Sequence, residues 1–550
     1  MRRFVLANVL ALSILGAARL HAQDDNRTRC ASSADPDLTI GACTAVIQSG
    51  QEPSSNLSIA FNDRGVAYTV KRDYDHAIAD FDQAIKLDAS NALPHVGRAD
   101  VYRQKGQNDL AMADCNEAIR LNPSLGVAYE SRGKVYAAMR DYARAIADYD
   151  QAITLDPSLP TALDDRGAAY SATGKYDLAV TDFTRELALD STYGPAYVSR
   201  GDAYESMDQY DKAIADYGAA IRLDSTNNDA WFSRGIAYGA QGQESRALFD
   251  LDRAVALNPD DVGARDARGL TYKLEGACGR AIPDFDHSLT VMPNDVQALT
   301  FRGECLTTMG QYETAIADFD RADSLAPNDA EVLDARGYAR TLSGRYDPAL
   351  ADLSRAIALD STKPAYFAHR AWAYFDLGQH HHALADFGAS LALDPEQYWA
   401  LFGRGVSHYA LGQYPAAIAD FTKSVGLDST RVYTLLWLHL ARAKMGVTDA
   451  AELRRRGAAL DLAAWPGPVV PYYLGRATAA RTRAAAARAE TADDQHERCE
   501  ASFYIGESEA LAKHTVAARK LLQQAVATCP HSFFEYAGAV SELKRLRSAD

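Results

Sequence analysis

A period of thirty-four residues runs through most of the chain and limits what it can fold into. An arginine recurs at this spacing, and an alanine recurs thirteen residues after each arginine. The arginines are Arg64, Arg98, Arg132, Arg166, Arg200, Arg234, Arg268, Arg302, Arg336, Arg370 and Arg404. A unit this short cannot bury its own apolar face, so neighbouring units must stack on one another.

Each unit has the pattern of two short amphipathic helices. Apolar residues follow the helical spacing of three and four, as in "YDHAIADFDQAI". The residue after the arginine is glycine in nine copies and alanine in two, Ala99 and Ala371. A glycine such as Gly310 lies between the two helices in eight copies, where a left-handed C-cap is expected. The pattern therefore predicts an all-α solenoid of helical hairpins.

The unit resembles the tetratricopeptide repeat (TPR) family in four features: its period, the pattern Gly–x2–Tyr, the pattern Ala–x3–Phe–x2–Ala, and a proline at its end. The resemblance covers eleven copies, from about residue 58 to 431. It implies a right-handed superhelix whose concave groove, lined by the first helix of each unit, holds peptides or extended protein segments.

An aspartate recurs on the second helix of every unit, sixteen residues after the arginine. Because a residue present in every copy cannot mark one site, we interpret the two columns as a ladder of ion pairs that sets how helices dock. The aspartates are Asp80, Asp114, Asp148, Asp182, Asp216, Asp250, Asp284, Asp318, Asp352, Asp386 and Asp420.

The resemblance also implies which residues face the groove, namely those two before, two after and five after the arginine. In the third to ninth units these are mostly acids: Glu130, Asp164, Asp202, Glu205, Asp266, Glu304 and Asp334, with Lys134 and Lys273 in the minority. The aromatic members are Phe232, Tyr338, Trp372, Phe375, Phe402 and Tyr409, with Trp399 one turn earlier. One hypothesis is an aromatic anchor site beside an acidic trough, suited to an apolar and basic polypeptide. The alternative is that these aromatic side chains pack against neighbouring helices.

The N-terminus has the pattern of a secretory signal peptide over residues 1–22: two arginines, an apolar run and small residues. Its removal takes away Arg2, Arg3 and Arg19, which moves the formal charge from −16 to −19. So acidic a chain repels phosphate backbones, which argues against a nucleic-acid partner. No later run is apolar enough to span a bilayer, and no cysteine follows the signal directly, so we expect an unlipidated periplasmic or secreted protein.

Seven cysteines in an exported chain predict disulfides and one free thiol. Cys115 occupies the core aromatic position of its unit and is expected to be buried and free. The other six give three candidate pairs, Cys30–Cys43 in an N-terminal capping segment (residues 23–57), Cys499–Cys529 across a late hairpin, and Cys278–Cys305 between adjacent units.

Residues 432–550 lose the arginine column and are expected to form a diverged helical module with one or two TPR-like hairpins and a capping helix. The series "LWLHLAR", "WPGPVV", "CEASFYIGE" and "EYAGAVSELKRL" resembles the C-terminal region of bacterial envelope TPR proteins of the NlpI type. That resemblance implies an envelope location.

No catalytic or nucleotide-binding motif is apparent, and "HHH" at 380–382 is interpreted as a solvated turn rather than a metal site. We expect no cofactor and no enzymatic activity. The sequence therefore predicts an exported scaffold that binds protein or peptide partners, with a self-associating structural or regulatory subunit as the alternative.

Overall fold

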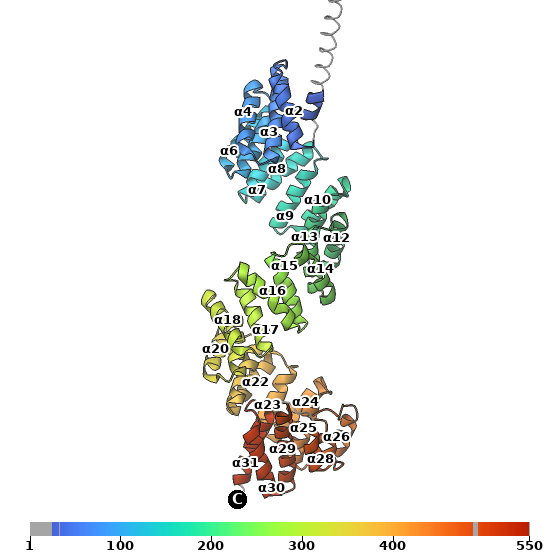
Figure 1. Ribbon diagram of the computed structural model, residues 1–550, viewed down its shortest axis with the longest axis vertical. Coiled ribbons are helices and arrows are strands. Elements are labelled where there is room, and N and C mark those ends of the chain that lie inside the picture. Colours follow the sequence, from blue (N-terminus) through green and yellow to red (C-terminus); the bar gives the residue numbers. More distant parts are fainter. Residues whose placement is uncertain (1–24, 32–33, 488–492, 549–550) are drawn as a thin grey trace, which may run out of the picture. The chain divides into compact units, whose positions relative to one another are not determined.

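The computed structural model describes residues 25–31, 34–487 and 493–548 (Figure 1), and the chain divides into two compact units between Pro259 and Asp260. The described residues are helical, with turns between the helices. The predicted signal peptide lies outside the described residues. No helix in the described ranges has the length and hydropathy needed to cross a bilayer.

Residues 54–427, which are described without a gap, form eleven helix pairs. The first helices are α3 (Ser54–Val70), α5 (Leu93–Gln104), α7 (Gly126–Ala138), α9 (Pro160–Ala172), α11 (Gly194–Glu205), α13 (Asn228–Ala240), α15 (Val262–Leu274), α17 (Val296–Thr308), α19 (Ala330–Leu342), α21 (Pro364–Asp376) and α23 (Tyr398–Ala410). The second helices are α4 (Tyr74–Leu87), α6 (Asn108–Leu121), α8 (Tyr142–Leu155), α10 (Tyr176–Leu189), α12 (Tyr210–Leu223), α14 (Glu244–Leu257), α16 (Cys278–Val291), α18 (Tyr312–Leu325), α20 (Tyr346–Leu359), α22 (His380–Leu393) and α24 (Tyr414–Leu427).

The turn inside each pair uses one residue with positive φ. Gly310, for example, has a φ of 76° and donates its backbone N–H to Thr307. Arg72, Arg140 and Asp208 take the same conformation in the three pairs that lack glycine there. The left-handed cap predicted from the sequence is therefore present in every pair.

The glycine after each ladder arginine lets the second helix approach the first. A Cβ on Gly303 would lie 2.7 Å from the Phe319 ring, closer than a real contact allows. In the second pair this position is Ala99, and the facing core residue is the small Cys115, which is buried and free as predicted. Burial raises the pKa of the Cys115 thiol to about 12. The sizes of the two facing residues are thus matched within that pair.

The predicted ion-pair ladder is confirmed in all eleven pairs. Each arginine donates two parallel hydrogen bonds, from Nε and Nη2, to the aspartate sixteen residues later, with distances of 2.6–2.9 Å. Every one of these aspartates is buried. Bidentate geometry fixes the angle of the arginine plane as well as its distance, so the pair orients one helix on the other.

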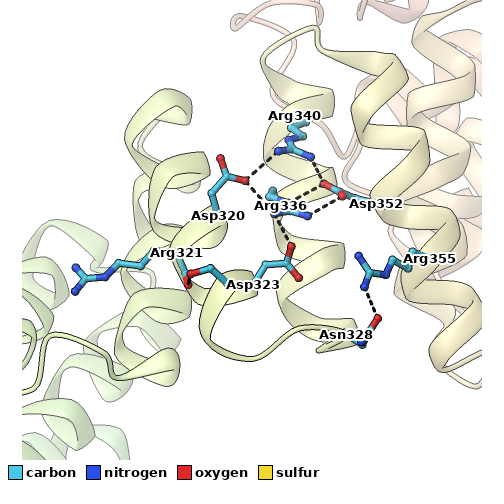
Figure 2. Close-up of polar contacts among 9 residues, drawn as sticks. Asp320, Arg321, Asp323, Asn328, Arg336, Arg340, Asp352 and Arg355 are labelled. Carbon is cyan, nitrogen blue, oxygen red and sulfur yellow. Dashed lines mark hydrogen bonds and ion pairs between the residues drawn. The ribbon is translucent and has the colours of Figure 1, made fainter.

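Several ladder arginines also reach the preceding repeat. Figure 2 shows Arg336 bound to Asp352 of its own pair and to Asp320 and Asp323 of α18, at 2.9 and 3.0 Å. Arg340 joins the same two carboxylates, Asp320 and Asp352. The ladder therefore connects repeats to one another as well as the two helices of one repeat.

The N-terminal cap is held by a disulfide between Cys30 and Cys43, the second of which lies on α2 (Pro36–Gln48). Helix α2 packs against α3. This segment covers the first repeat, as the sequence predicts.

The C-terminal module contains α25 (Val432–Lys444), α26 (Ala450–Gly457), α27 (Val469–Tyr473), α28 (Ala479–Ala485), α29 (Asp493–Leu511), α30 (Thr515–Thr528) and α31 (Phe534–Ser548). A disulfide joins Cys499 on α29 to Cys529 at the end of α30. Trp437 is fully buried and stacks on Phe503, with ring centroids 5.2 Å apart. The module therefore has its own aromatic core.

The expected pairing of Cys278 with Cys305 is wrong, because both are free and buried. Burial, and then the neighbouring Cys278 thiol, raises the pKa of Cys305 well above the usual range.

Candidate functional site

Three adjoining cavities follow the first helices of the second unit. The first, of about 450 Å³, extends from Lys273 on α15 and Glu304 on α17 to Tyr338 on α19 and His369 on α21. The second, of about 420 Å³, shares Tyr338 and His369 and continues to Trp399 on α23. We call this surface, with the third cavity described next, the C-terminal groove.

The third cavity, of about 330 Å³, shares Trp399 and Phe534 with the second. Its other walls include Tyr433 on α25 and Glu500 on α29. Residues Ser532–Phe534 therefore line the groove where the repeats meet the C-terminal module.

Two acids in the first cavity have basic partners. Glu304 forms an ion pair with Lys273 at 2.6 Å. Asp334 lies 2.9 Å from Nδ1 of His369, whose ring stacks on Tyr338 at a centroid distance of 4.4 Å. The predicted acidic trough is thus partly neutralised by the protein itself in this region.

The aromatic anchor hypothesis needs correction at three positions, because Phe375, Phe402 and Tyr409 are buried. The Phe534 ring lies 4.7 Å from Phe402 and 5.8 Å from Phe375. Tyr409 packs edge-on against Trp437 at 5.1 Å. The chain's own C-terminal module packs against these side chains, so the alternative of internal packing holds for Phe375 and Tyr409, while Phe402 also lines the third cavity.

Other predicted aromatic residues do line the groove. Trp399 is 51% exposed, and Tyr338 and Trp372 are half-buried. Arg431 lies over the rings of both Tyr398 and Trp399, at 5.6 and 5.5 Å from their centroids. An aromatic surface of this size beside solvent-accessible cavities is typical of a binding site.

The third cavity contains a buried carboxyl group. Oε2 of Glu500 accepts hydrogen bonds from Tyr433 and from Nε1 of Trp465, each at 2.8 Å. Burial, together with the nearby Glu535, raises the pKa of Glu500 to about 8. Both hydrogen-bond donors belong to the C-terminal module, so this acid is held by tertiary contacts.

The predicted groove residues of the first unit include Glu130, Asp164, Asp202 and Phe232. Glu130 is buried and paired with Lys134 at 2.5 Å, and Asp202 accepts a hydrogen bond from Tyr217 at 2.8 Å. Asp164 and Phe232 are half-buried. In the second unit Asp266 is half-buried, and burial raises its pKa.

Sequence reasoning missed Asp376, Glu500 and Phe534. Asp376 stands six residues after its ladder arginine, one residue beyond the last position considered for the groove. Glu500 and Phe534 lie outside the periodic region, where the repeat offers no frame of reference. A Phe–Phe pair just before the last amphipathic helix was the available signal for Phe534.

Among the residues that the structure describes, no cluster of three His, Cys, Asp or Glu side chains has the arrangement of a metal site. The "HHH" segment is the first turn of α22 rather than a solvated turn, and His380 is half-buried with its ring 5.4 Å from Phe375. Burial lowers the pKa of His380 to about 4.

Comparison with protein families identifies the repeats. Tetratricopeptide repeat models match residues 62–125, 126–159, 296–329 and 369–431, and a TPR repeat model matches residues 201–242. The chain therefore contains tetratricopeptide repeats and folds as an all-α TPR solenoid. These matches end at residue 431 and do not extend to the C-terminal module.

Solved structures of TPR proteins are similar to parts of the chain. PilF of Pseudomonas aeruginosa is 16% identical with a TM-score of 0.36, over 39% of this chain and 97% of that one. A TPR protein of Parabacteroides merdae is 18% identical with a TM-score of 0.38, over 45% and 98%. The Cut9–Hcn1 structure gives 13% identity and a TM-score of 0.40, over 74% and 93%. A search of curated proteins gave no significant match.

Proposed function

We propose that this protein is an exported, non-enzymatic adaptor of the bacterial envelope, and that it holds an extended polypeptide segment of a partner protein in the C-terminal groove. The observation that carries the proposal is the run of three adjoining cavities over α15 to α23, with the exposed Trp399 between two of them. TPR repeats are in general a protein-interaction fold, and the cavities follow the surface that such repeats present to peptides.

Two features of the groove support a polypeptide ligand over a small molecule. The cavities are open and share wall residues along several helices, which suits an extended chain with side chains entering successive pockets. Their walls combine aromatic rings with a few charged groups, which is the composition of a recognition surface.

Export is supported by the N-terminal sequence pattern, from which we infer the envelope location. Disulfides Cys30–Cys43 and Cys499–Cys529 agree with an oxidising compartment. Sequencing the N-terminus of the mature protein tests this part, and the expected first residue is Gln23.

Site-specific photocrosslinking tests the groove. A photoreactive phenylalanine derivative replaces Trp399 in one variant and the exposed Leu393 of α22, which does not line the three cavities, in the control. In living cells position 399 should form an adduct with another protein that position 393 does not form. Equal adducts at both positions would contradict the groove as the binding site, and adducts only with a second copy of this chain would favour self-association.

A further inference from the structure

The middle cavity of the C-terminal groove has a carboxylate among aromatic rings. Its walls include Tyr338 on α19, Trp372 and Asp376 on α21, Trp399 on α23 and Phe534 at the start of α31. The Trp372 ring packs against Phe534 at a centroid distance of 5.8 Å, so the aromatic side of the cavity is fixed by contacts within the unit. We call this space the Asp376 cavity.

Asp376 differs from Glu304 and Asp334, two acids of the first cavity, in having no basic side chain as an ion-pair partner. Glu304 is paired with Lys273, and Asp334 with His369. Within the described part of the chain, no Lys, Arg or His side chain forms an ion pair with Asp376. Asp376 is therefore a carboxylate in the wall of the middle cavity for which the described residues supply no ion-pair partner.

The position of Asp376 is unfavourable for a carboxylate in two further ways. It is the last residue of α21, where the helix dipole disfavours negative charge. It is also half-buried, and burial alone raises its pKa to about 7. A residue that breaks several stability rules at the wall of a cavity is a candidate for recognition, because a bound cation would relieve all of these costs.

We propose that the Asp376 cavity is a subsite for a basic side chain, arginine or lysine, of the polypeptide held in the groove, which is a proposal that rests on the function above. The cationic end of that side chain pairs with the Asp376 carboxylate. Its alkyl part lies against Trp372 and Tyr338, whose ring faces attract cations.

The protein itself uses the same chemistry at its arginines. Arg431 lies over Trp399 and Tyr398 while its guanidinium is paired with Asp428 at 2.9 Å. An arginine between an aspartate and aromatic rings is therefore a stable arrangement next to the Asp376 cavity. The basic side chain of the partner polypeptide would take the corresponding place between Asp376 and the aromatic rings of the Asp376 cavity.

Binding is expected to depend on pH. The titratable and charged groups around Asp376 are Tyr338 on α19, Tyr346 on α20, His369 on α21, His380 on α22 and, beside His380, Lys544 on α31. Burial raises the pKa of both tyrosines and lowers that of His380 to about 4, so these three keep one charge state between pH 6 and 8. Asp376 gains its charge in this interval, so affinity for a cation should rise with pH.

Selection from a phage library of random dodecapeptides on the full-length protein tests the proposal. The wild type should retain peptides enriched in arginine or lysine, and Asp376→Asn should retain peptides without this enrichment. Asp347→Asn, an exposed aspartate of α20 that lines none of the three groove cavities, is the matched control and should select as the wild type does.

One selected peptide is then compared with a copy in which citrulline, which has the shape of arginine without its charge, replaces the basic residue. The wild type should bind the citrulline peptide at least tenfold more weakly at pH 8, with a smaller difference at pH 6. Asp376→Asn should bind both peptides equally at both values. His369 is present in both the wild type and Asp376→Asn, so a pH dependence that is lost in the variant comes from Asp376.

The outcomes separate the two proposals. Peptides retained without basic enrichment, or enrichment that persists in Asp376→Asn, would overturn the basic subsite and leave the polypeptide groove standing. No retained peptide from the wild type would overturn both. Circular dichroism of Asp376→Asn shows whether it is folded, which we expect because the substitution removes a poorly placed charge.

Discussion

Residues 262–427 and residues 432–548 lie in the same unit, yet they bury charged side chains in different ways. In the repeats, a carboxylate such as Asp318 is matched by an arginine sixteen residues earlier, Arg302. In the C-terminal module, the buried Glu507 and Glu542 share Lys444, each at 2.7 Å, across more than sixty residues of sequence. The repeats therefore solve the problem of buried charge locally, and the module solves it through long-range contacts.

This difference shows which parts of the structure follow from the local sequence and which depend on contacts between distant residues. An ion pair between residues sixteen apart can recur in every repeat. The repeats therefore form a regular scaffold whose groove differs from repeat to repeat only in the residues that do not recur. A long-range solution holds one arrangement in place, and here it positions Phe534 and Glu500 at the end of the groove. The C-terminal module thus forms part of the candidate site as well as capping the solenoid.

The largest effect is expected from Lys444→Met in the module. It would leave Glu507, which is fully buried, and Glu542 without their shared cation, and breaking a buried pair costs about 3–5 kcal/mol. Urea unfolding followed by tryptophan fluorescence measures this, because Trp437 and Trp465 lie in the module. Lys423→Met, at an exposed position of α24, should change stability by less than about 0.5 kcal/mol. Equal effects of the two would contradict the contrast drawn here.

A smaller loss is expected from Arg302→Leu in the repeats, about 2–4 kcal/mol, because Asp318 would stay buried without its partner. The double variant Arg302→Leu/Asp318→Leu should recover most of the loss, since replacing both members of a buried pair is close to neutral. Hydrogen exchange of α17 and α18 reports the local stability. If the double variant is as unstable as the single one, the pair of Arg302 and Asp318 would stabilise the repeat in its own right, and not merely satisfy each other's buried charge.

The smallest effect is expected from Cys115→Phe, about 1–3 kcal/mol, because the larger ring would meet the Cβ of Ala99. Adding Ala99→Gly creates the glycine and aromatic pair seen at Gly303 and Phe319 and should remove most of the loss. Thermal unfolding of the two variants and of Ala99→Gly alone gives the coupling between the positions. No coupling would show that the two residues are not matched in size.

Much of the fold could be predicted because the residues that make its main contacts recur at the same positions in each repeat. The arginine and aspartate columns identify a bidentate pair, and the glycine before each core ring identifies a close helix contact at Gly303 and Phe319. The candidate site was only partly predictable. Trp399 and Trp372 line it as expected, and Phe402 lines it although it is buried against Phe534. Phe375 has the same pattern in sequence but is buried against Phe534 and lines none of the three cavities.

The sequence by itself determined the helical pairs, their turns and the ladder that joins them, because each depends on residues close together in the chain. Only the tertiary structure decided which groove side chains are accessible, that Cys278 and Cys305 are free thiols, and that Asp376 lies in a cavity without a basic ion-pair partner among the described residues. These features depend on segments far apart in sequence, such as α21 and the start of α31, and a local pattern contains no information on which distant residue will cover it.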